Sequence, residues 1–194
     1  MNKIIISKEG DWNCFLWEGI LWKKIHKRLK CKELTSLYKA CSLEEAGLIF
    51  FQIELKAAKA LCLFWLGRRG FFHKEIEEKL RFLGVSRESI VEVLLFCERI
   101  GVIDDVKHLQ VLKERAWRKG KGAQLVRMKT RHFVEDRESS VDLSAERESL
   151  IFFLQKKQIN PSTLAWEQKC RLQGLLCRRG FSVALIEEVF SPQN

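Results

Sequence analysis

Apolar residues recur at helical spacing along most of the chain from residue 42 onward. Ile76, Leu80 and Leu83 stand at positions i, i+4 and i+7, which places them on one face of a helix. Gly84 is suited to ending this helix, and Ser86 is a good N-cap for the next one. The next apolar stripe is formed by Ile90, Val93, Leu94 and Cys97. The pattern therefore predicts a mainly α protein built from short helices.

The first long helix is predicted to begin at a capping box and to end near Leu66. In Ser42-Leu-Glu-Glu45, the serine hydroxyl can accept an unpaired backbone N–H while Glu45 reaches back. The run Arg68-Arg69-Gly70 would then supply a cationic last turn and a glycine stop. With the helices that end at Gly84 and Gly101, this helix makes a first group of three.

A second group follows with weaker signals. Asp104 can cap a helix that Gly120 and Gly122 end, and further helical stretches are expected over 124–131 and 134–139. The apolar stripe of its first helix consists of Leu109, Leu112 and Ala116.

The last group is predicted to begin near Ser144. Asn160-Pro161 is an N-cap followed by proline at the first helical position, and the helix that it starts should run to about Arg178. Gly180 ends that helix and Ser182 caps the final one. The residues expected to face inward are Leu150, Phe153, Leu154, Ile186, Val189 and Phe190.

Two segments match each other at a constant offset of 96 residues. Gly84-Val85-Ser86 corresponds to Gly180-Phe181-Ser182, and the apolar positions of the helices that follow also coincide. Two units of about 48 residues would leave room for one degenerate repeat between them, as in helical repeat proteins. Chance similarity between two amphipathic helix pairs is the alternative. We predict a three-helix repeat at 42–105, a degenerate basic repeat at 106–142 and a third repeat at 143–194.

The first 25 residues favour β structure. Ile4 to Ile6 is one candidate strand, and 13–22 holds a pair broken at Glu18-Gly19, which suits a tight turn. We predict a small N-terminal β-hairpin, with residues 1–41 forming the hairpin and a linker.

The positive charge of the chain is concentrated in one segment. The chain has 35 Lys+Arg and 25 Asp+Glu, a net charge of +10, and residues 106–140 alone account for +6. Such a cluster can track a phosphate backbone, although most charge runs are simply solvated helix faces. The predicted nucleic-acid-binding residues are Lys113, Arg115, Arg118, Lys119, Lys121, Arg127, Lys129 and Arg131.

Two arginine pairs are secondary basic candidates. Arg68-Arg69 and Arg178-Arg179 each precede a glycine expected to end a helix, where cations favour the negative end of the dipole. That structural role is the preferred interpretation, and a ligand role is compatible with it.

Recognisable catalytic or metal-binding patterns do not occur in the sequence. The seven cysteines include no Cys-x-x-Cys, the four histidines are scattered, and Gly120-Lys121-Gly122 lacks the Gly-Lys-Ser/Thr of a P-loop. Free thiols fit a reducing cytoplasm, and the start of the chain lacks the long apolar segment of a secretory signal. We expect a cytoplasmic, non-enzymatic protein without metal or cofactor.

Two stretches resemble the RecX family of recombination regulators. The first runs from Ala60-Leu61 through Arg68-Arg69-Gly70-Phe71, Gly84-Val85-Ser86 and Ile90 to Gly101-Val102-Ile103-Asp104-Asp105. The second is Arg178-Arg179-Gly180-Phe181-Ser182 with Ile186. The family-motif residues are Asp104, Asp105, Gly180 and Phe181. The N-terminal hairpin resembles the extension that some members carry.

The resemblance implies tandem three-helix repeats in an elongated, curved molecule. It also implies a monomer that binds the filament of RecA protein on single-stranded DNA. Binding is expected to modulate the ATPase and strand-exchange activities of the filament, and the expected effect is inhibition. These activities serve homologous recombination, DNA repair and the SOS response. Where the family has an aromatic residue after Asp-Asp, this chain has His108, and Arg131-His132-Phe133 replaces a Lys-Gly-hydrophobic element.

Two other classes of function fit the same residues. One is a general helical DNA-binding protein without RecA dependence, although Glu88, Glu92 and Glu98 on the predicted 87–99 helix would repel phosphate. The other is a structural helical-repeat adaptor, for which the basic segment would have no role in nucleic-acid binding.

Overall fold

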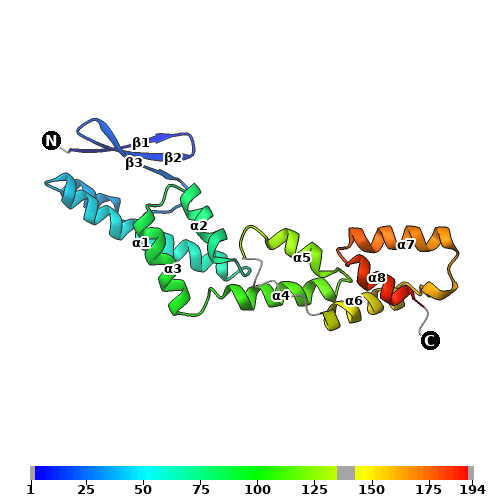
Figure 1. The fold of residues 1–194 in the computed structure, drawn as a ribbon. Helices are drawn as coiled ribbons and strands as arrows, with labels where there is room; N and C mark the ends of the chain where they lie inside the picture. Colours follow the sequence, from blue (N-terminus) through cyan, green and yellow to red (C-terminus); the bar gives the residue numbers. More distant parts are fainter. Residues whose placement is uncertain (1–2, 135–142, 192–194) are drawn as a thin grey trace. The chain divides into compact units, whose positions relative to one another are not determined.

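The computed structural model describes residues 3–134 and 143–191 of the chain. The chain divides into an N-terminal unit, residues 1–104, and a C-terminal unit, residues 105–194. Helices make up most of both units, and the described strands all lie in one small antiparallel sheet at the N-terminus (Figure 1). The predicted fold class, mainly α with a small β element first, is confirmed. The division into three repeats stays a prediction.

The N-terminal β element has one strand more than the predicted hairpin. Strands β1 (Ile4–Glu9), β2 (Trp12–Trp17) and β3 (Ile20–His26) form an antiparallel sheet in chain order. Glu18 and Gly19 both have positive φ, of 48° and 87°, and make the tight turn between β2 and β3 that was predicted. The candidate strand at Ile4–Ile6 extends to Glu9 and pairs with β2, which completes the sheet.

Helix α1 (Leu43–Leu66) packs against this sheet after a short 3₁₀ helix, η1 (Leu34–Lys39). Phe15 of β2 is fully buried, and its ring meets that of Phe50 edge-on at 5.0 Å between centroids. Trp22 of β3 meets the same ring at 5.3 Å. A small sheet gains stability by packing a hydrophobic face against a helix, and these aromatic contacts join the sheet to α1.

The predicted limits of α1 are confirmed, but its predicted stop is wrong. Ser42 Oγ accepts from the Glu45 amide at 3.1 Å, while Glu45 Oε2 accepts from the Cys41 amide at 2.8 Å. At the other end, Gly67 is the C-cap, with a right-handed φ of −67°, and its amide donates to Leu63 O at 2.9 Å. Because the helix already ends there, Arg68-Arg69-Gly70 lies beyond its last turn.

Helices α2 (His73–Phe82) and α3 (Arg87–Arg99) complete the N-terminal unit, joined by the predicted turn at Gly84. Gly84 has φ +80°, and a Cβ there would lie 2.5 Å from Lys24 O of β3, so only glycine fits. Ser86 is the N-cap of α3 as predicted, but its side chain bonds elsewhere.

The Ser86 side chain bonds to the buried carboxylate of Glu54 on α1. Its oxygens accept from the Ser86 amide at 3.2 Å, from the Ser86 hydroxyl, and from the Ser89 hydroxyl at 2.5 Å. Glu54 is 1% exposed. A carboxylate from one helix therefore caps the N-terminus of another, where negative charge is favoured.

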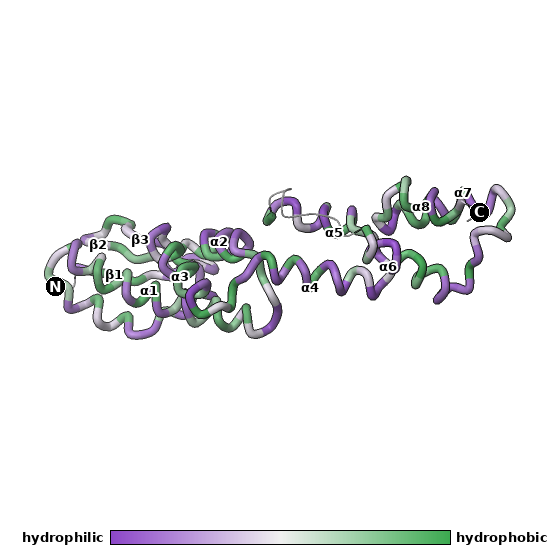
Figure 2. The backbone as a smooth tube through the Cα atoms, turned by 60° about the horizontal axis from the view of Figure 1, so that its bottom comes forward, coloured by the Kyte–Doolittle hydropathy of each residue, from purple (hydrophilic) through white to green (hydrophobic). Residues whose placement is uncertain are grey.

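The C-terminal unit contains α4 (Asp105–Trp117), α5 (Ala123–Thr130), α6 (Leu143–Lys156), α7 (Trp166–Arg178) and α8 (Val183–Phe190). Figure 2 shows hydrophobic and hydrophilic residues alternating along these helices, as expected where one face is buried. One hydrophobic core cluster of this unit consists of the buried residues Leu150, Phe153, Leu154, Leu172, Leu176, Phe181, Leu185 and Ile186. Most of the predicted 134–139 helix lies outside the described residues.

The helix predicted from Asn160 to Arg178 is interrupted. Asn160 caps only a single 3₁₀ turn, η3 (Pro161–Thr163), by accepting from the Ser162 amide at 3.0 Å. The backbone then becomes extended at Leu164 and Ala165 before α7 begins. Leu164 packs against the core of the unit, and this packing favours the break over a continuous helix.

The turns at the two matching segments have the same hydrogen bonds. The amides of Gly84 and Val85 donate to Arg81 O and Leu80 O at 3.0 and 3.2 Å. The amides of Gly180 and Phe181 donate to Cys177 O and Leu176 O at 2.9 and 3.2 Å. Gly180 also has a positive φ, of 88°. Both turns thus follow the Schellman pattern, and Ser182 caps α8 as predicted, through Leu185 N at 3.3 Å.

Candidate nucleic-acid interface

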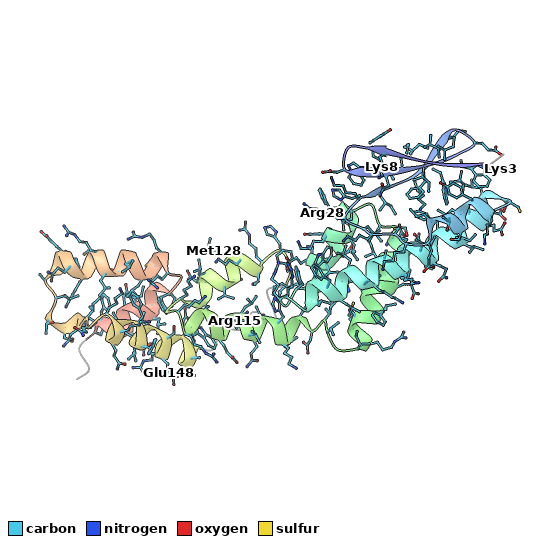
Figure 3. All side chains as sticks on the ribbon, turned by 180° about the vertical axis from the view of Figure 1, so that it is seen from behind. Lys3, Lys8, Arg28, Arg115, Met128 and Glu148 are labelled. Carbon is cyan, nitrogen blue, oxygen red and sulfur yellow. The ribbon has the colours of Figure 1, made fainter. Side chains whose placement is uncertain are left out.

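A basic groove lies between α4 and α5 in the C-terminal unit. It has a volume of about 300 Å³ and combines cationic with apolar walls. Figure 3 labels Arg115 on α4 and Met128 on α5, the two helices that flank it. Its lining residues are Leu112, Arg115, Ala116, Lys119, Lys121, Leu125, Val126, Lys129 and Thr130.

The turn between α4 and α5 explains why the cations converge. Arg115 lies in the last turn of α4 and Lys129 in the last turn of α5, while Lys119 and Lys121 lie in the loop that joins the two helices. Between them the chain reverses at Gly120, whose φ is +60°. Gly122 is the N-cap of α5.

The structure brings together four of the eight predicted binding residues and not the others. Those that do not line the groove are Lys113, Arg118, Arg127 and Arg131. Arg118 is highly exposed and pairs with Glu114, with 3.8 Å between nitrogen and oxygen. Within the part of the chain that the structure describes, the four groove cations form no ion pair. The charge of the groove is therefore available to an external anion.

The loop that carries Lys119 and Lys121 is fixed by the turn after α7. Gly122 N donates to Arg179 O at 2.9 Å, and Gln124 N donates to Gly180 O at 3.0 Å. The Arg179 guanidinium donates back to Lys119 O and Gly120 O at 3.3 and 3.0 Å. The same guanidinium lies 4.2 Å from the ring centroid of Phe153. Arg179 thus positions the loop, with its donors directed into the protein.

Glu146 of α6 holds the first residue of α5 by a hydrogen bond. Its carboxylate accepts from the Ala123 amide at 2.8 Å, at the first residue of α5. The side chain is buried, and burial raises its pKa above the usual value while the Ala123 amide acts in the opposite direction. Ser149, one turn further along α6, donates to Trp117 O at 2.9 Å at the end of α4. Helix α6 therefore holds both walls of the groove.

The remaining arginine candidates lie elsewhere. Arg68 stacks over Phe64 at 4.5 Å, and Arg69 stacks over Phe71 at 3.7 Å. Arg69 also pairs with Glu75 of α2 at 2.5 Å. Arg178 is exposed in the last turn of α7, where a cation favours the helix dipole.

The family-motif residues have structural positions. Asp104 directly precedes α4 and Asp105 is its first residue. Gly180 forms the turn described above, and Phe181 is 1% exposed in the core. A Cβ on Gly180 would come within 3.0 Å of the Leu125 backbone, so this glycine also allows the approach of α5.

Sequence reasoning missed the supporting residue Glu146, and it named Arg179 as a secondary basic candidate without its bonds to the loop at 119–120. Nothing in the local sequence marks Glu146, because its partner is 23 positions away. It also missed a second basic run at 23–32, because summing charge over 1–55 gives only +2. A ten-residue window would have found that run.

Within 3–134 and 143–191, the structure shows no cluster of three His, Cys, Asp or Glu side chains able to hold a metal ion. Over the same residues, no helix combines the length and hydropathy needed to cross a membrane.

Comparison with known proteins places the chain in one class of fold. No family model matches the sequence, and no curated protein matches it. Solved structures do match. The crystal structure of regulatory protein RecX is similar over 97% of both chains, with a TM-score of 0.57 and 14% identity. RecX from Lactobacillus salivarius is similar over 70% of this chain and 94% of its own, with a TM-score of 0.59 and 17% identity. The chain therefore has a RecX-like fold.

Proposed function

We propose that this protein is a RecX-type regulator that binds the RecA–single-stranded-DNA filament and inhibits its ATPase and strand exchange. The observation that carries the proposal is the RecX-like fold, which extends over 97% of both chains in one comparison. Such a regulator acts as a monomer in the cytoplasm, takes part in recombination and DNA repair, and has no catalytic site of its own.

The groove between α4 and α5 supports the nucleic-acid part of the proposal. Four cations without an ion pair among the described residues surround a strip of apolar side chains. Lysine and arginine side chains bind phosphate oxygens and release condensed counterions, which drives association with DNA. We assign this groove to the DNA strand or to an acidic surface of the filament.

The direct test is ATP hydrolysis by RecA on single-stranded DNA, titrated with this protein. We expect a dose-dependent fall in hydrolysis. The charge-reversed variant Arg115→Glu/Lys119→Glu/Lys129→Glu should need roughly tenfold more protein for the same effect, because it removes three phosphate contacts.

A matched control reverses three exposed cations of the same unit outside the groove: Lys156→Glu, Lys157→Glu and Arg171→Glu. This variant should inhibit like the unaltered protein. An unchanged ATPase, with binding to bare DNA intact, would refute the RecA-specific function and favour a general DNA-binding protein. Equal loss in both variants would refute the assignment to the groove.

A further inference from the structure

A second lysine-lined groove lies in the N-terminal unit, away from any residue assigned above. It has a volume of about 540 Å³ and is formed by α1 and by the segment before η1. Its lining residues are Lys30, Lys32, Glu33, Gln52, Ile53, Leu55, Lys56, Ala57, Lys59 and Ala60. We propose that this groove binds single-stranded nucleic acid, independently of the groove between α4 and α5 and of any action on RecA.

The sequence concentrates positive charge at this point. Residues 23–32 contain six lysines and arginines and no acid, and Arg28, labelled in Figure 3, is one of them. Within this run, Lys24 pairs with Glu9 at 3.1 Å and Lys27 pairs with Asp11. Among the described residues, Lys30 and Lys32 form no ion pair. Lys23 and Arg28 also form no ion pair among these residues, so two of the four cations of the run without an ion pair, Lys30 and Lys32, line the groove.

Helix α1 supplies the other two lysines of the groove. Lys56 and Lys59 are three residues apart and so lie on one face of the helix. Lys59 Nζ stands 4.8 Å from the ring centroid of Phe96, which holds its side chain near the groove. The lining also includes Ile53, Leu55 and two alanines. The groove thus combines lysines with apolar side chains.

This arrangement fits a polymer of phosphates with exposed bases. Lysine is a flexible point charge, suited to following a backbone without sequence preference, whereas a site for one small phosphate ester normally has arginine forks or converging backbone amides. A single strand exposes base faces that can cover the apolar side chains of the groove, whereas a duplex buries them in its stack. An acidic peptide has the charge but lacks the bases.

One acidic residue of the groove pairs with one of its lysines. Glu33 is the single carboxylate among the lining residues, and it holds Lys56 at 2.8 Å. The hydrogen bond from Lys56 lowers the pKa of Glu33, so the carboxylate is ionised at neutral pH. A bound phosphate must compete with Glu33 for this lysine. Removing the carboxylate should therefore strengthen binding.

The experiment measures affinity for a fluorescent oligothymidylate as a function of salt concentration. Lys30→Gln/Lys32→Gln/Lys59→Gln should lower the slope of log K against log salt by about 2, since each lost phosphate contact on a single strand removes about 0.7. The matched control, Lys8→Gln/Lys39→Gln/Lys74→Gln, removes the same charge from exposed positions outside the groove. It should leave the slope unchanged.

Glu33→Gln provides a test in the opposite direction. Freeing Lys56 should tighten binding by roughly two- to fivefold, the range expected for one exposed ion pair. An unchanged slope in the groove variant, or an equal loss in the control, would overturn the site. Competition by poly-glutamate at matched charge would overturn its assignment to nucleic acid. RecA is absent throughout, so the result is separate from that of the ATPase test.

Discussion

Gly122 closely approaches the turn after α7. A substitution at Gly122 therefore tests directly whether this contact holds the groove between α4 and α5 in place. An added Cβ on Gly122 would lie within 3.0 Å of the Gly180 carbonyl, which is backbone and cannot rotate away. Gly122 itself has φ −81° and ψ 167°, a conformation that alanine adopts freely. The substitution Gly122→Ala therefore adds a steric contact without adding backbone strain at its own position.

The expected magnitude follows from the bonds that span this contact. Relief of the overlap must separate the two segments, which breaks the bonds from Gly122 N to Arg179 O and from Gln124 N to Gly180 O. A buried polar group left unpaired costs about 1–3 kcal/mol. We therefore expect Gly122→Ala to lower the free energy of unfolding by about 2–4 kcal/mol. For a unit of this size the melting temperature should fall by roughly 10–25 °C.

The assay is thermal unfolding followed by circular dichroism, with Gly174→Ala as the control. A Cβ on Gly174 would meet only Arg178 Nη1, at 3.7 Å, an ordinary van der Waals distance. Gly174 lies inside α7, so alanine there should stabilise the protein by about 0.5–1 kcal/mol. If Gly122→Ala melts no lower than the unaltered protein, the close backbone contact described here does not hold the loop, and the reasoning is refuted.

Three further predictions concern buried groups. Glu54→Ala should lower the free energy of unfolding by about 3 kcal/mol in urea titration, because it leaves buried donors unpaired; a loss below about 1 kcal/mol would contradict the carboxylate's capping role. For Glu146, whose pKa burial raises, the stability it contributes is present at low pH and is lost as pH rises through that pKa. Glu146→Gln should therefore weaken the fall in melting temperature from pH 4.5 to 7, and an unchanged pH profile would count against it. Burial raises the pKa of Cys62 to about 12, so iodoacetamide at pH 8 should label the exposed Cys41 and Cys170 first. Mass spectrometry reads the order of labelling, and early labelling of Cys62 would contradict its burial on α1.

Much of the fold could be predicted because its signals are local. Ser42 and Ser182 mark helix starts through their own hydroxyls, and Gly84 and Gly180 mark stops because the turns need positive φ. The signal at Asn160 was equally local, yet it began only a 3₁₀ turn. There the packing of the following segment decided the outcome, and a sequence pattern does not encode that packing.

The basic character of the candidate site could be predicted from the sequence, but which of the basic residues line the groove could not. Charge counting found Arg115 and Lys119 together with Arg118, although only the first two line the groove. Which cations converge depends on how α5 packs against α4, and that is set by contacts distant in sequence. The second groove escaped notice for a related reason. Its lysines at 30 and 56 lie 26 positions apart, and the sum over residues 1–55 includes the acids that offset Lys30 and Lys32 but leaves out Lys56.

The hydrogen bonds between the loop at 119–124 and the turn at 179–180 also set an order of events during synthesis. The chain leaves the ribosome from its N-terminus, so α4 and α5 emerge long before Arg179 does. Until then, the amides of Gly122 and Gln124 lack their carbonyl partners, and the carbonyls of Lys119 and Gly120 lack the guanidinium. The basic groove is thus completed only after Arg179 and Gly180 have been translated. A nascent or prematurely terminated chain would carry its positive charge without the geometry that directs it.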